Sequence, residues 1–240
     1  MITAPSNAAV DTLLEKLIIA LPSAGSQIVR LGRVGGDTHS KERAERFYLQ
    51  RFELDHLVDK QIEEYRQSKK GILSSDTDGY LRKQFEQELL MRARVVVTTL
   101  VTSANIQVSS FLSQGSQLPI VIVDEATQCT EPQCLIPLAV KPSLLILVGD
   151  SHQLAATIQN PYLDRMGYGV SLFERLENNE YPKLSLRVQY RMSPAICDWP
   201  NHYVYKDQLI NSHQVCHPNF RYLFCETEIP SYAFIDLNSV

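Results

Sequence analysis

The sequence lacks the features that mark secreted, membrane-spanning and strongly basic proteins. It has no run approaching about 18 consecutive apolar residues, the length a bilayer-spanning helix needs, and no basic start followed by an apolar segment. Its five cysteines are an odd number without C-x-x-C spacing, which argues against a disulfide framework and favours reduced thiols. The net charge of −4 argues against a histone-like mode of nucleic-acid binding. These absences predict a soluble intracellular protein.

A zinc motif is also missing, although possible ligands occur close together near the end of the chain. His213, Cys216, His217 and Cys225 are numerous enough for a zinc tetrad, but their spacing matches no known pattern, so we predict no zinc site there. What is present is a globular composition, with 44% hydrophobic and 21% charged residues in 240. That length suits one large domain or one and a half.

Three short apolar runs predict a parallel β-sheet. The runs 95–97, 120–123 and 144–148 are rich in β-forming residues and too short for helices. Each ends at a polar or glycine-bearing turn, which is typical of central strands buried on both faces of such a sheet. Residues 131–140 between the second and third runs have the length of a helix. The sequence therefore predicts a βαβ unit and an α/β fold.

The first 31 residues predict another helix and strand. Ser6 or Asn7 can cap a helix that ends by Pro22, and residues 27–31 alternate as a short strand. The apolar positions of this helix fall at helical spacing: Val10, Leu13, Leu14, Leu17 and Ile18.

Residues 37–94 differ in kind, since 24 of these 58 residues are charged, 12 of each sign. Two apolar stripes at helical spacing, separated by residues 71–79, predict an antiparallel helical hairpin. The stripes are Leu54, Val58, Ile62 and Tyr65, and then Leu81, Phe85 and Leu89. Two interpretations stay open: a solvated arm that only acts as a spacer, or a stalk that positions an accessory domain over a nucleic-acid channel.

Two carboxylates, Asp124 and Glu125, directly follow the second apolar run, at the sheet edge where α/β proteins bind ligands. Asp124 is placed to hold Mg²⁺, and Glu125 to orient and deprotonate an attacking water. The third run ends in Gly149-Asp150 followed by Gln153, which is suited to sensing a terminal phosphate while hydrogen-bonding the carboxylate that positions water. In the alternative, Asp124-Glu125 and Gln153 only cap local structure.

A third string, 186–196, places Tyr190 beside Arg191. An arginine offers a planar fork that matches phosphate oxygens, and a tyrosine offers a flat face on which a base stacks. The alternative is a structural pair that anchors a helix beginning near Pro194.

Five strings together resemble the Upf1-like and senataxin-like (DNA2/NAM7-type) branch of the superfamily-one helicases. They occur in the order of that family: Ala4-Pro5-Ser6-Asn7-Ala8-Ala9-Val10-Asp11, Val97-Thr98-Thr99, Val123-Asp124-Glu125-Ala126, Gly149-Asp150-x-x-Gln153-Leu154 and Gln189-Tyr190-Arg191-Met192. The resemblance implies a RecA-like P-loop NTPase lobe at 1–36 and 95–182, a helical stalk insertion at 37–94, and the start of a second RecA-like lobe at 183–240.

The resemblance also implies roles for individual residues. Asp124 and Glu125 match the Mg²⁺-binding and catalytic acidic pair, Gln153 the γ-phosphate sensor, Arg191 an arginine finger, and Tyr190 a residue that stacks on adenine. Positions that match contacts to a nucleic-acid backbone are Pro5, Ser6, Asn7, Thr98 and Thr99. The implied protein is an ATP- and Mg²⁺-dependent motor moving 5′ to 3′ on single-stranded RNA or DNA, without sequence preference. RNA-processing partners and a nuclear or cytoplasmic location, the nucleus slightly favoured, complete the expectation.

The sequence departs from the family in two places. No G-x-x-x-x-G-K-[S/T] loop is present to cradle phosphates, so we expect a fragment that is inactive by itself. Ser151, Ala155 and Ala156 replace prolines that are usual in the family, which loosens the loop that carries Gln153. The rival interpretation is a non-catalytic module that binds nucleic acid weakly or acts as a scaffold in RNA processing.

Overall fold

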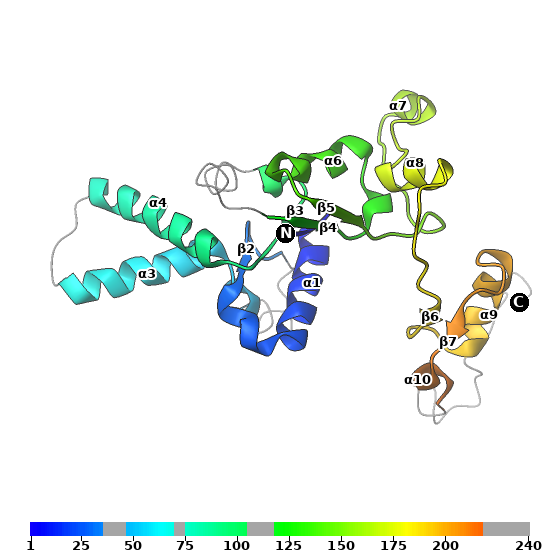
Figure 1. The fold of residues 1–240 in the computed structure, drawn as a ribbon, viewed down its shortest axis with the longest axis horizontal. Helices are drawn as coiled ribbons and strands as arrows, with labels where there is room; N and C mark the ends of the chain where they lie inside the picture. The colour runs from blue at the N-terminus through cyan, green and yellow to red at the C-terminus, as the bar shows by residue number, and fades with distance from the viewer. Residues whose placement is uncertain (36–46, 70–74, 105–117, 218–240) are drawn as a thin grey trace, which may run out of the picture. The chain divides into compact units, whose positions relative to one another are not determined.

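The computed structural model describes residues 1–35, 47–69, 75–104 and 118–217 of the chain (Figure 1). These residues belong to two units that divide between Glu180 and Tyr181. The first unit contains a five-stranded sheet, and the second contains a two-stranded sheet. Within those ranges, no helix is long and apolar enough to span a bilayer.

All five strands of the first unit are parallel. From one edge to the other they are β2 (Ile28–Arg30), β3 (Val95–Thr99), β1 (Ile2–Ala4), β4 (Ile120–Val123) and β5 (Leu144–Leu147). Ile2 of the central strand lies opposite Val97 on one side and Ile122 on the other. A parallel sheet packed between helices confirms the predicted α/β, RecA-like class.

The strand β5 corrects one prediction, because it lies at an edge of the described sheet and is not buried on both faces. It pairs with β4 only, and its side chains alternate between exposed and half-buried positions. Leu144 is 50% exposed and Ile146 is 38% exposed. The prediction was wrong because a short apolar run reports the hydrophobicity of a strand, whereas its position in the sheet depends on which segments pair with it.

Helices α1 (Asn7–Ala20) and α6 (Glu131–Leu135) lie on opposite faces of the sheet (Figure 1). The hydroxyl of Ser6 accepts from the N–H of Ala9 at 3.2 Å, which confirms the predicted cap. The predicted apolar stripe is buried at Val10, Leu14 and Ile18 and packs on Ile28 and Val97. The helix ends before a 3₁₀ segment, Pro22–Gln27, so β2 begins one residue later than predicted.

The helix expected at residues 131–140 is split into two parts. The short helix α6 has a capping box at Thr130, and a 3₁₀ segment, Ile136–Val140, follows it. Pro137 explains the change, because it has no N–H with which to continue α-helical bonding. The face that α6 covers also packs against α8 (Leu172–Asn178), and α7 (Pro161–Arg165) lies in the connection after β5.

The charged insertion forms the predicted antiparallel hairpin of α3 (Leu54–Lys69) and α4 (Ser75–Arg92) (Figure 1). Of the two predicted stripes, the side chains of Leu54, Val58, Ile62 and Leu81 are buried, and the ring of Tyr65 meets that of Phe85 edge-on at 6.2 Å. The helix α4 begins at Ser75, so the connection is shorter than the predicted 71–79.

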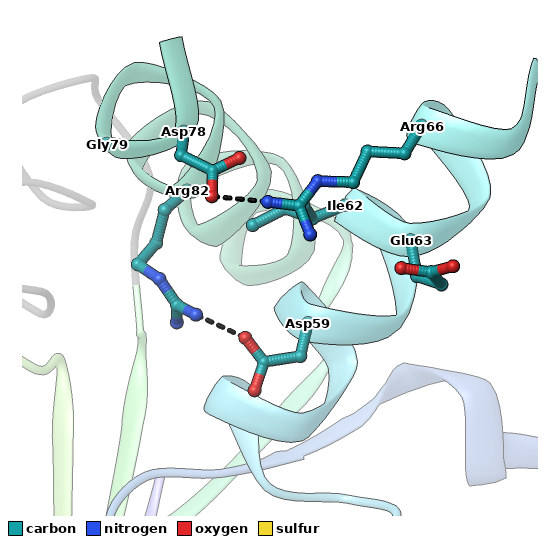
Figure 2. Close-up of a pocket in the computed structure, with 7 residues that line it drawn as sticks. All are labelled: Asp59, Ile62, Glu63, Arg66, Asp78, Gly79 and Arg82. Atoms are coloured by element: carbon teal, nitrogen blue, oxygen red, sulfur yellow. Dashed lines mark hydrogen bonds and ion pairs between the residues drawn. The ribbon is translucent and has the colours of Figure 1, made fainter. Parts of the chain in front are cut away.

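Ion pairs between the two helices border a groove of about 330 Å³ near the tip of the hairpin (Figure 2). Arg82 of α4 pairs with Asp59 of α3, and Arg66 of α3 pairs with Asp78 of α4 at 2.5 Å. Each pair is substantially exposed, so we expect each to contribute at most about 1 kcal/mol. The apolar stripe is therefore the main source of stability in the hairpin.

Replacing Gly79 by alanine should stabilise the hairpin. This glycine lies within α4, and a Cβ added there would meet nothing within 4 Å. Alanine is the better helix former by about 0.5–1 kcal/mol, so the free energy of unfolding should rise by that amount. Urea unfolding followed by circular dichroism measures the change.

A matched control for that substitution is Gly167→Ala. Gly167 also has open space around it, but its φ is 82°, a conformation that costs an L-residue roughly 1–2 kcal/mol. The control should therefore be destabilised. Equal effects of the two substitutions would show that backbone conformation does not decide the outcome.

In the second unit, the parallel strands β6 (Val188–Gln189) and β7 (Ile210–Asn211) accompany α9 (Pro194–Tyr203) and α10 (His213–Cys216). The start of α9 at Pro194 agrees with the predicted helix. The strand-like segments expected at 221–224 and 232–235 lie outside the described residues, as does Cys225.

Candidate functional site

The acidic pair Asp124-Glu125 lies at the carboxyl edge of the first unit's sheet. The N–H of Asp124 donates to the carbonyl oxygen of Thr3 at 2.8 Å, which ties the pair to the neighbouring strand β1. Both acidic side chains are half-buried. Asp124 thus offers a hard oxygen ligand where parallel sheets bind their ligands, which fits Mg²⁺ held by one or two carboxylates, water and phosphate.

Glu125 has a left-handed backbone conformation, with φ 52° and ψ 41°. Such a conformation costs a residue with a side chain roughly 1–2 kcal/mol, so the surrounding contacts must maintain it. The N–H of Ala126 donates to the carbonyl of Val148 at 2.8 Å, and Oε2 of Glu125 accepts from Nε2 of Gln128 at 2.9 Å. These bonds fix the direction of the carboxylate, as a residue that orients a water requires.

Two buried cysteines support this turn, and no sequence motif had singled them out. Sγ of Cys129 lies 3.5 Å from the carbonyl oxygen of Glu125, and Sγ of Cys134 lies 3.9 Å from that of Ala126. A hydrogen bond with Cys134, together with burial, raises the pKa of Cys129. The Cys129 thiol therefore stays protonated, and its single S–H is shared between Cys134 and the carbonyl oxygen of Glu125.

The loop after β5 carries Gln153, the proposed phosphate sensor. Nε2 of Gln153 donates to Oδ2 of Asp150 at 2.8 Å, and the N–H of His152 donates to Oδ1 at 3.0 Å. Gln153 is exposed, so it is accessible to a ligand. The bond expected between Gln153 and the catalytic carboxylate is not formed among the described residues, because Asp150 and Gln128 are nearer partners in sequence.

The turns after β4 and β5 approach each other closely at Gly149. A Cβ added to this glycine would lie 3.1 Å from Cγ2, 3.2 Å from N and 3.3 Å from Oγ1 of Thr127. Because β4 and β5 are parallel neighbours, the acidic pair and the Gln153 loop share one edge of the sheet, as the sequence predicted.

Gly149→Ala should destabilise the first unit by about 1–3 kcal/mol, the usual cost of inserting atoms into packed space. The added Cβ would push the two turns apart at Thr127. Urea unfolding followed by circular dichroism measures the loss. Unchanged stability would show that the two turns separate without cost.

The two threonines of the predicted nucleic-acid surface differ. Thr98 is fully buried, and its hydroxyl donates to the carbonyl of Leu31 at 3.4 Å, so its side chain does not reach a surface ligand. Thr99 is half-buried, and its hydroxyl accepts from the N–H of Thr102 at 3.2 Å. The alternation of side chains along a strand explains why adjacent threonines cannot both face one surface.

Residues Pro5, Ser6 and Asn7 follow β1 at the same edge. Ser6 and Asn7 are exposed and Pro5 is half-buried. The Ser6 hydroxyl already accepts a capping hydrogen bond, but its own proton remains a donor. The amide oxygen of Asn7 accepts from Nη2 of Arg30 at 3.1 Å.

Arg30 is the residue of this edge that sequence reasoning missed. Its side chain is fully buried at the end of β2, where Nε contacts Oδ1 of Asp11 at 2.8 Å. The spacing of Asp11 and Arg30, one on a helix and one on a strand, gives no periodic signal. An arginine inside an otherwise apolar run such as 28–31 is the one available hint.

Tyr190 and Arg191 are exposed in the second unit, in a turn that Gln189 organises. Oε1 of Gln189 accepts from the backbone N–H groups of Arg191 at 2.9 Å and Met192 at 2.8 Å, and Nε2 donates to Oδ1 of Asn211 at 2.6 Å. The side chain of Gln189 therefore fixes the turn and leaves Tyr190 and Arg191 open to a ligand.

No group of three or more His, Cys, Asp or Glu side chains in the described part of the chain is arranged to hold a metal ion. Cys225, one of the four residues weighed for zinc, lies outside that part.

Comparison with known proteins finds matches along most of the chain. Two family models, each described as an AAA domain, match residues 59–161 and 168–240. A similar protein is "Regulator of nonsense transcripts 1" of Dictyostelium discoideum, 32% identical over 88% of this chain and 16% of its own length. "Probable helicase MAGATAMA 3" of Arabidopsis thaliana is 33% identical over 87% of this chain and 24% of its own length.

A third relative is "ATP-dependent helicase NAM7" of Saccharomyces cerevisiae, which is 31% identical over 88% of this chain and 22% of its own length. The chain thus spans between about a sixth and a quarter of the length of these three relatives.

Proposed function

Because this chain belongs to the Upf1-like superfamily-one helicases, we propose that it forms part of an ATP-dependent motor that moves 5′ to 3′ on single-stranded RNA or DNA. The observation that carries this proposal is the shared sheet edge at which Asp124 and Glu125 follow β4 while the Gln153 loop follows β5. The strained and hydrogen-bonded turn at Glu125 supports a role for that carboxylate in the reaction.

In this proposal each polar group at the edge has one role in hydrolysis. Asp124 would hold Mg²⁺, and the ion would supply positive charge to the phosphates. Glu125 accepts a proton from the attacking water, and Gln153 contacts the terminal phosphate. For Arg191 and Tyr190 we propose a guanidinium contact with phosphate oxygens and stacking on adenine, and both residues are exposed.

The nucleic-acid surface that we propose is formed by Pro5, Ser6, Asn7 and Thr99, whereas Thr98, which is buried inside the paired strand β3, makes no contact with the ligand. Hydroxyl, amide and N–H groups at these positions suit the sugar-phosphate backbone, so binding should be independent of sequence. RNA-processing proteins are the partners that we propose, and either the nucleus or the cytoplasm is a suitable location.

We assign residues 1–36 and 95–182 to one RecA-like lobe, 37–94 to a stalk and 183–240 to the start of a second lobe. The sequence has no G-x-x-x-x-G-K-[S/T] loop, so the residues present hold the Mg²⁺ edge of a nucleotide site but not its phosphate cradle. This chain alone should therefore not turn over ATP. The same lack favours the second candidate, a non-catalytic module that binds nucleic acid.

Binding of a fluorescent ATP analogue with Mg²⁺ distinguishes the two functions. The comparison is between this chain and a version extended upstream to include any encoded phosphate-binding loop. The motor proposal expects tight binding and RNA- or DNA-stimulated turnover in the longer protein only. Absence of both from the longer protein would favour the non-catalytic module.

A further inference from the structure

The guanidinium of Arg30 is buried, and each of its three nitrogens donates a hydrogen bond. Its side chain is 0% exposed. Nε donates to Oδ1 of Asp11 at 2.8 Å, Nη1 to the carbonyl oxygen of Leu31 at 3.3 Å, and Nη2 to Oδ1 of Asn7 at 3.1 Å. An arginine donates hydrogen bonds and accepts none. The atom of Asn7 that faces Arg30 must therefore be the amide oxygen and not the amide nitrogen.

This bond determines what Asn7 presents to solvent. With the oxygen held by Arg30, the second branch of the planar amide, Nδ2, points in the other direction from Cγ, and no acceptor among the described residues takes up its two N–H groups. Asn7 is exposed, so a ligand can reach this nitrogen. The outward side of Asn7 therefore offers hydrogen-bond donors only. It can bind an acceptor on a ligand, such as a phosphate or sugar oxygen, but not a donor group.

Neighbouring contacts keep Arg30 from turning away. Asp11 balances its charge through Oδ1, while Oδ2 of Asp11 accepts from the N–H of Gly35 at 2.8 Å. A Cβ at Gly35 would lie 3.1 Å from Cβ of Asn7, so glycine lets this loop pack closely on the same residue. The helix α1, the end of β2 and the loop that contains Gly35 are thus joined around one guanidinium.

We propose that Arg30 is a positioning residue for nucleic acid, which fixes the amide of Asn7 with its oxygen inward and its N–H donors outward toward the backbone of a single strand. This inference rests on the proposed nucleic-acid surface and adds to it a reason for the orientation of Asn7. Arg30 itself does not touch the ligand.

The decisive variant is Asn7→Asp. Aspartate keeps an oxygen acceptor for Arg30, so the fold and melting temperature should be retained or improved. Its outward atom is an oxygen, so the donor is lost. We expect the affinity of the full chain for a fluorescein-labelled oligouridylate, measured by anisotropy, to fall by about tenfold, since hydrogen bonds to charged groups have that weight. Gln84→Glu, an equal change of charge on the exposed side of α4, should leave it unchanged.

The role of Arg30 is tested by a cycle of Arg30→Lys, Asn7→Ala and the double variant. Lysine keeps the charge near Asp11 but has no fork with which to hold Asn7. Each single variant should weaken oligonucleotide binding, and the double variant should bind no worse than Asn7→Ala alone, because the two residues act through one contact.

Three results would overturn the inference, and they are distinguishable from one another. Additive losses in the cycle would show that Arg30 does not act through Asn7. Wild-type binding by a folded Asn7→Asp protein would show that the outward donor is not used, while the nucleic-acid surface itself stands. No binding by the wild-type chain would remove the proposed surface and this inference together. If Arg30→Lys fails to fold, Arg30→Gln, which removes the charge but keeps an amide donor, takes its place in the cycle.

Discussion

Asp11→Ala should lower the free energy of unfolding of the first unit by about 3–5 kcal/mol, the usual result of removing one partner from a buried ion pair. Arg30 is fully buried, and Asp11, which is 12% exposed, is the carboxylate that balances its charge. The substitution would leave a guanidinium in a low-dielectric interior without its counter-ion and would also remove the acceptor of the Gly35 N–H. Urea unfolding followed by far-ultraviolet circular dichroism measures the loss. Tryptophan fluorescence is unsuitable because the only tryptophan, Trp199, belongs to the second unit.

Two control variants test whether the loss comes from the unpaired buried charge of Arg30. Glu64→Ala removes one partner of the exposed pair with Lys60, in which the two side chains are 64% and 68% exposed, and should change stability by less than about 0.5 kcal/mol. The double variant Asp11→Leu with Arg30→Met removes both charges and should lose less than Asp11→Ala. A loss below about 1 kcal/mol for Asp11→Ala would show that water or a local shift compensates the buried charge.

Local patterns predicted the first helix and the hairpin well. The cap at Ser6 and the stripe of Val10, Leu14 and Ile18 depend on interactions within one turn or one helix face, which a sequence displays directly. The edge position of β5 was not predictable in the same way. It depends on the pairing of segments far apart in the chain, and such pairing leaves no periodic signal in the strand itself.

The candidate site shows the same division. The sequence predicted its location, because the carboxyl ends of parallel strands meet at one edge of a sheet. Asp124-Glu125 and the Gln153 loop each follow such a strand, and the two strands are neighbours. The contacts of individual side chains did not follow. Thr98 proved to be buried, Gln153 donates a hydrogen bond to Asp150, and Arg30 donates one to Asn7. Each of these facts depends on side-chain direction across elements, which neither spacing nor family resemblance specifies.

Glu125→Gln should reduce ATP turnover by about 10²–10⁴-fold, the usual contribution of a general base. The measurement uses a version of the chain extended upstream to include any encoded phosphate-binding loop, assayed with saturating single-stranded RNA. Glutamine has nearly the shape of glutamate and can keep the contact with Gln128 after its amide turns, but it cannot accept the proton of the attacking water. Affinity for ATP and Mg²⁺ should therefore change little, since Asp124 is the proposed ligand of the metal.

Two further variants separate chemistry from support of the turn. Gln128→Ala removes the bond to Oε2 of Glu125 but leaves the carboxylate in place, so we expect a loss of turnover smaller than that of Glu125→Gln. Glu131→Gln is the control for loss of a nearby negative charge, because that residue begins α6 and its carboxylate pairs with Arg175 through two bonds of 2.7 and 2.8 Å. If Glu125→Gln and Glu131→Gln reduced turnover equally, the effect would come from charge or stability, and Glu125 would not be the base.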